Sequence, residues 1–216
     1  MVKLDSREEI SKKQSEKKSF YLLPPDEDYV GYIGAIREIE QDVWGTKTGE
    51  KEKKLAVDLL LIKTFDDSPL VSDTDKEGKG GDEIAEGSMI LTMYNINPKA
   101  TGFMQDNPSK FRSLIAYSTG QNINGAIEYE GVEDFVGKYI GFNCKQYVKK
   151  DGNLSGKVSC FRKTPKSFEP TDEGIEKHKG MFEDVLAKIK ERSAAKKVKE
   201  SSETNKANEP EFIDVP

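Results

Sequence analysis

Alternation of apolar and polar residues predicts a mainly β domain in the middle of the chain. Runs in which every second residue is apolar are typical of strands that bury one face. The second of these runs becomes apolar on both faces after Leu59, as expected of a central strand. The predicted strands cover Tyr29–Glu40, Lys54–Phe65, Ser88–Asn95, Tyr139–Val148 and Lys157–Lys163.

Two further segments have the spacing of helices. Asn107 can cap a helix and Pro108 is tolerated in a first turn, while Gly120 can end the same helix. After Pro170, apolar residues recur with helical spacing as far as Ile189. We expect the stripe of this last helix to pack on the β domain or on a partner helix.

The order of elements is three strands, a helix, two strands and an appended helix. A five-stranded Greek-key barrel with a helix between strands three and four is the OB-fold, which we expect here. Charged residues make up 34% of the 216 residues, which favours disordered ends around a folded core. The expected parts are a charged arm (1–27), the OB-fold core (28–168), a helix (169–199) and a disordered acidic tail (200–216).

The last two strands are expected to form a hairpin around a loop at Asp151–Asn153. With that loop Cys144 lies opposite Cys160, as two small core residues rather than a redox pair. Ile140, Phe142, Cys144 and Val148 would then share the apolar face. The other face would carry Asn143, Lys145 and Tyr147 opposite Phe161, Ser159 and Lys157.

Charge is distributed unevenly along the chain. The net charge is −5, yet the segment between Val136 and Ser167 holds eight basic residues and one acid. A basic patch with interleaved aromatic rings is typical of proteins that bind single-stranded nucleic acid. The alternative is a solvated hairpin whose lysines keep its edge soluble. Trp44, in the first long loop, could stack on a base or cap one end of the barrel.

In OB-folds the binding surface is the face of strands two and three together with the loops between strands one and two and between strands four and five. Both loops are rich in lysine here. The candidate nucleic-acid-binding residues are Trp44, Lys47, Lys51, Lys53, Lys54, Tyr94, Lys145, Tyr147, Lys149, Lys150, Lys157, Phe161 and Lys163.

The sequence offers little for catalysis or metal binding. The one histidine, His178, lies on the expected last helix, where such a residue usually serves packing or the surface. Two cysteines and one histidine are too few for a zinc site. Asp73 to Gly78 copies the start of a calcium-binding EF-hand loop, but its twelfth position is Ile84, where a glutamate is needed. We expect a solvated acidic loop, with no enzyme activity, cofactor or metal.

The chain resembles the phage-encoded OB-type single-stranded-DNA-binding proteins of replication and recombination. The resemblance covers roughly Asp28 to Lys166 and is carried by "YVGYIGAIREIE", "TKTGEKEKKLAVDLLLI", "PSKFRSLIAYSTG" and "EDFVGKYIGFNCKQYVKKDGNLSGKVSCF". It implies binding of single-stranded DNA without sequence specificity, in the cytoplasm of a bacterial host cell.

The end of the chain, "EPEFIDVP", is similar in kind to the acidic tails of bacterial single-strand-binding proteins, although those end on phenylalanine and this one ends on Pro216. The similarity implies that the tail recruits replication or recombination proteins through Phe212, Ile213, Asp214 and Val215. No apolar run is long enough to span a membrane. A homo-oligomer is compatible with the sequence.

Two other functions remain open. One is an OB-type interaction module, such as a phage inhibitor or adaptor, whose last helix and tail bind a host protein without any DNA affinity. The other is a hydrolase subunit in which clustered carboxylates hold a metal, with Asp73, Asp75, Asp82 and Glu83 as candidates.

Overall fold

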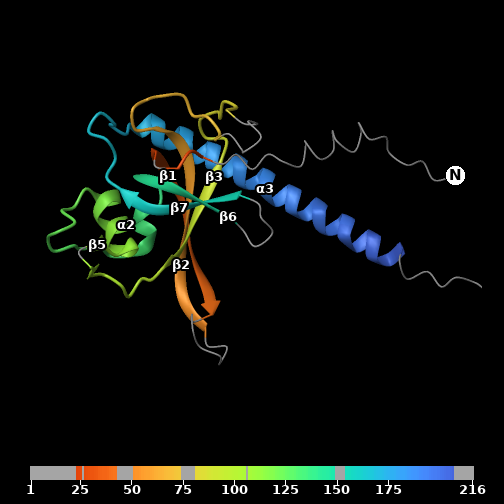
Figure 1. The fold of residues 1–216 in the computed structure, drawn as a ribbon, viewed down its shortest axis with the longest axis horizontal. Coiled ribbons are helices and arrows are strands. Elements are labelled where there is room, and N and C mark those ends of the chain that lie inside the picture. Colours follow the sequence, from red (N-terminus) through yellow and green to blue (C-terminus); the bar gives the residue numbers. More distant parts are fainter. Residues whose placement is uncertain are drawn as a thin grey trace, which may run out of the picture.

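The computed structural model describes residues 23–25, 27–42, 51–73, 81–105, 107–148 and 154–206 (Figure 1). Its body is a five-stranded antiparallel sheet in the order β3-β2-β1-β6-β7. The strands are β1 (Asp28–Asp42), β2 (Lys51–Thr64), β3 (Ile90–Ile96), β6 (Tyr139–Val148) and β7 (Leu154–Arg162). The predicted mainly β class is confirmed.

The sheet follows Greek-key order. Strands β1, β2 and β3 are consecutive neighbours, and β6 returns over a long connection to pair with the first half of β1. The prediction of a closed barrel is not confirmed, because β3 and β7 remain the two edges of the sheet, although their Cα atoms come within 8 Å of each other. Strand β3 ends at Ile96, two residues before Pro98, which has no backbone N–H to donate to a neighbouring strand.

Helix α2 (Lys110–Thr119) covers the inner face of the sheet with Phe111, Leu114 and Ile115. It begins two residues later than expected. Ser109 is the N-cap, because its Oγ accepts a hydrogen bond from the backbone N–H of Arg112 at 3.1 Å. The predicted cap and first-turn residues instead form β5 (Asn107–Pro108), which pairs with β4 (Phe103–Met104). A short 3₁₀ helix, η1 (Val132–Phe135), precedes β6.

Helix α3 (Asp172–Lys206) packs on the outer face, so the first half of β1 and β2 from Leu55 onward are buried on both sides. Phe182 reaches the backbone of β1 at Gly34, where an added Cβ would lie 2.1 Å from the phenylalanine ring. Glycine is therefore needed at this position for the helix to dock. The apolar stripe packs on the β domain, and the helix extends to Lys206, past its predicted end at residue 199. Among the described helices, none combines the length and apolar character needed to cross a membrane.

The chain's single histidine holds α3 to the loop before β3. His178 is buried, with its Nδ1 2.6 Å from the hydroxyl of Tyr139 and its Nε2 2.6 Å from Oε1 of Glu86. Lys177 donates to both carboxylate oxygens of Glu86, at 2.9 and 3.1 Å. The histidine is thus a packing residue with both ring nitrogens engaged, which is one of the two roles that the sequence left open.

The docking of α3 should weaken in acid. Partial burial raises the pKa of Glu86, but hydrogen bonds from His178 and Lys177 outweigh it and hold the net pKa below its ordinary value of 4.5. The carboxylate therefore stabilises the fold above pH 4.5, and this contribution is lost as the pH falls through the lowered pKa. Thermal unfolding should give the wild type a higher Tm than Glu86→Gln above pH 4.5, and this difference in Tm should become smaller below pH 4.5. A difference that stays constant across the titration would contradict the role of this carboxylate.

Candidate nucleic-acid interface

Three of the predicted lysines of the first hairpin, Lys51, Lys53 and Lys54, lie on strand β2 rather than in a loop, and each is paired with a glutamate. Lys51 lies 3.8 Å from Glu40, Lys53 lies 3.2 Å from Glu38, and Lys54 lies 2.8 Å from Glu52. Exposed ion pairs of this kind contribute little stability. They do cancel the local positive charge, so this ribbon attracts phosphate less than its lysine content suggests.

The second hairpin is different, because the two described lysines of its strands have no acidic partner; the other cation, Arg162 at the end of β7, pairs with Asp28. Lys145 and Lys157 occupy directly opposed positions on β6 and β7, and neither pairs with a carboxylate in the part of the chain that the structure describes. Like charges facing each other across a strand pair are destabilising. A local conflict of this kind is expected at a binding site, where an anionic ligand would relieve it.

An aromatic ring lies among these charges. Tyr147 is 43% exposed, and the ammonium nitrogen of Lys157 lies 5.4 Å from its ring centroid. Lys110, the first residue of α2, is a third cation near this group: partial desolvation lowers its pKa, and so does the charge of Lys157. We call Lys110, Lys145, Tyr147 and Lys157 the hairpin cluster. It offers ammonium groups for phosphates and a ring face for a base.

Phe161 does not belong to this cluster, so the prediction that it faces outward is wrong. Its side chain is 4% exposed, and the residue pairs with Phe142 in the core. A β-bulge between Asn143 and Cys144 is the cause. The predicted register opposed Cys144 to Cys160. In the structure Cys160 lies opposite Asn143 and Val158 opposite Cys144. One extra residue in a strand exchanges its faces beyond that point.

A second exposed group lies on the outer face of β1, β2 and β3, beyond the area that α3 covers. Tyr94, one of the candidate binding residues, is 52% exposed there. Beside it, Arg37 donates two hydrogen bonds to the buried Asp58, from Nε at 2.8 Å and Nη2 at 2.9 Å. Thr92 donates to the same carboxylate at 2.7 Å. Asp58 thus fixes a half-exposed guanidinium next to an exposed ring.

Sequence reasoning missed Arg37, because the residue that orients it lies on another strand. It also missed a third exposed ring, Phe103, whose centroid lies 4.8 Å from the guanidinium carbon of Arg112. Arg112 donates to the carbonyls of Ile123, Thr101 and Gly125, so it serves mainly to hold the segments around α2.

Several predicted residues lie outside the described part of the chain. One further candidate, Lys163, does lie in the described part of the chain, where it is exposed just after β7. The predicted residues that fall outside are Trp44, Lys47, Lys149, Lys150, Phe212, Ile213, Asp214 and Val215, together with the loop at Asp151–Asn153.

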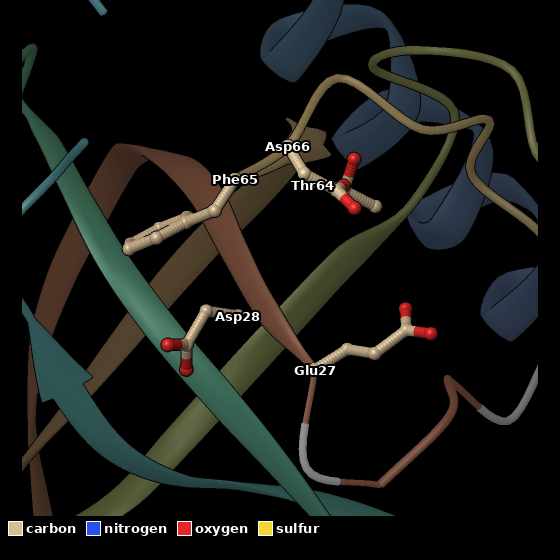
Figure 2. A pocket seen from close by; sticks show the side chains of 5 residues that line it. All are labelled: Glu27, Asp28, Thr64, Phe65 and Asp66. Carbon is tan, nitrogen blue, oxygen red and sulfur yellow. The ribbon is translucent and has the colours of Figure 1, made fainter. Parts of the chain in front are cut away.

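The cleft shown in Figure 2 is acidic and unsuited to phosphate. It is lined by Glu27, Asp28, Thr64, Phe65 and Asp66. Figure 2 shows the carboxylates of Glu27 and Asp28 pointing in opposite directions, and Nε of Arg162 lies 2.8 Å from Oδ1 of Asp28. Within the described residues, no group of three or more potential ligands is placed to hold a metal.

Comparison with known proteins adds no assignment. No protein-family model matches this chain, and no curated protein is found to match it.

The two rings of the second hairpin should respond oppositely to truncation. Phe161→Ala removes a buried ring, so the free energy of unfolding should fall by about 3–5 kcal/mol. Tyr147→Ala removes an exposed ring, so the change should stay within about 0.5 kcal/mol. Denaturant unfolding of both variants measures the difference. Equal losses of stability would show that Tyr147 also packs in the core.

Proposed function

We propose that this protein binds single-stranded DNA without sequence specificity and has no enzymatic role. The observation that carries the proposal is the hairpin cluster, in which Lys145 and Lys157 lie unpaired beside the exposed ring of Tyr147. Unpaired lysines attract phosphates whatever the sequence, and every base has a face that can stack on an aromatic ring.

The architecture supports the same proposal. The Greek-key order, the helix before β6 and the close approach of the two open edges are features of the OB-fold, a partly open five-stranded barrel. In that fold the outer face of the second and third strands takes part in binding. Tyr94 lies on this face with Arg37 of β1 beside it, and the hairpin cluster borders the loop between the last two strands.

The resemblance in sequence gives the proposal its biological setting. We infer that the protein protects single-stranded DNA during phage replication or recombination, and that its acidic tail recruits partner proteins. A protein-interaction module of the same fold would lack affinity for oligonucleotides, so the binding experiments below decide between the two functions.

The lysines of the two hairpins should contribute unequally to binding. We expect Lys145→Gln/Lys157→Gln to weaken binding of oligo-dT and to make its salt dependence shallower by about 1.4, because each phosphate contact in single strands contributes about 0.7 to the log–log slope. The matched control, Lys51→Gln/Lys53→Gln, removes two cations that already have partners and should change the slope less. Fluorescence titration at several salt concentrations measures both.

The Tm of Lys145→Gln/Lys157→Gln should be unchanged or higher, because the substitutions relieve like-charge repulsion. A loss of affinity without a loss of Tm then shows that DNA contacts were removed and that the protein is still folded. The proposal fails if the control variant loses as much affinity as the hairpin variant, or if the wild type binds no oligonucleotide.

Stacking on Tyr147 can be tested separately from charge. Tyr147→Ala should cost about 1–3 kcal/mol of binding free energy, whereas Tyr147→Phe keeps the ring and should retain affinity. Phe103→Ala serves as the control, because this ring is exposed to a similar degree but is contacted by Arg112 rather than by Lys157. If Tyr147→Ala and the control bind equally well, the ring does not stack on DNA.

A further inference from the structure

Helix α3 is much longer than the surface on which it packs. Its side chains are buried or half-buried at intervals up to Leu186, whereas every residue from Ala187 to Ala194 is exposed. Figure 1 shows the second half of the helix running away from the sheet. The part from 187 to 206 measures about 30 Å at about 1.5 Å per residue. We call this part the projecting half of α3.

The projecting half is not built to meet another apolar surface. Ile189 is the last apolar residue of the packed stripe, and it is 43% exposed. Helical spacing continues that stripe to positions 193, 196 and 200, which are Ser193, Lys196 and Glu200. A helix that docked on a second copy of the chain, or in an apolar groove, would need hydrophobic residues at these positions.

Its charge instead fits an extended anion. Between positions 188 and 199 the sequence holds six basic residues and one acid, Glu191. The spacing of positions 188, 192, 196 and 199 places them along one face of the helix. Lys188 and Arg192 form no ion pair with any residue that the structure describes. A row of cations along one face of a helix, with Lys188 and Arg192 unpaired among the described residues, is complementary to a phosphate backbone.

We propose that the projecting half of α3 binds the phosphate backbone of the same single strand that the hairpin cluster binds, and so lengthens the binding site beyond the β domain. This inference rests on the proposed function for its ligand. Phosphate contacts of this kind carry no sequence information, which agrees with non-specific binding. An isolated helix of this length is marginal in water, so contact with the strand would also stabilise it.

The test compares oligonucleotides of two lengths on the full chain. A dT oligomer of about 8 nucleotides falls within the roughly 4–16 that one OB-fold covers, and one of about 30 exceeds that range. The variant is Lys188→Gln/Lys190→Gln/Arg192→Gln. The control is Lys179→Gln, an exposed lysine on the half of α3 that packs against the sheet.

We expect the variant to bind the short oligomer as the wild type does. With the long oligomer it should lose affinity, and its salt slope should become shallower by up to about 2, at about 0.7 for each lost phosphate contact. The control should match the wild type at both lengths. Circular dichroism of each protein shows whether the helix is retained.

Failure of this inference differs from failure of the proposed function. Equal affinity of variant and wild type for the long oligomer would overturn the role of α3 while leaving the hairpin cluster in place. A wild type that binds neither oligomer would overturn both. Sedimentation that shows a dimer in the wild type and a monomer in the variant would assign the projecting half to self-association instead.

Discussion

The contact between Phe182 and Gly34 determines how this chain is assembled. Because position 34 has no side chain, the phenylalanine ring lies directly on the backbone of β1 and brings α3 onto the outer face of the sheet. The first half of β1 and most of β2 are then buried on both sides. The hydrogen bonds of His178 to Tyr139 and Glu86 fix the helix at the same place. The docked helix covers one end of the outer face. The end that carries Arg37 and Tyr94 remains exposed.

The two hairpins are both rich in lysine, but they differ in whether those lysines have carboxylate partners. On the first, Lys51, Lys53 and Lys54 each have a glutamate within 4 Å, so this end of the ribbon carries nearly equal charges of both signs. On the second, Lys145 and Lys157 face each other without a carboxylate and are repelled. Folding alone gives no reason for that repulsion, whereas binding of a polyanion does. The arrangement of partners, rather than the number of lysines, therefore indicates where a strand would bind.

Local patterns predicted the elements well, because strand and helix periodicity depend on near neighbours in sequence. The five strands, the helix before β6 and the left-handed Gly120 that ends it were all predicted from such patterns. The errors arose where one extra residue shifts the in–out alternation of a strand, or where two interacting residues are far apart in the sequence. The bulge at Asn143 reversed the orientation of Phe161, and the pairing of Arg37 with Asp58 spans two strands. Neither leaves a periodic signal in the sequence.

The central claim is that single-stranded DNA meets the second hairpin and not the first. The most direct measurement is a titration of isotope-labelled full-length protein with a dT oligomer, followed by NMR of the backbone amides. We predict that the largest shifts fall on residues 143–148 and 154–158 and on Lys110, with little change at the paired residues 38–40 and 51–54. Shifts confined to the first hairpin, or to the acidic cleft between Glu27 and Asp66, would contradict the account.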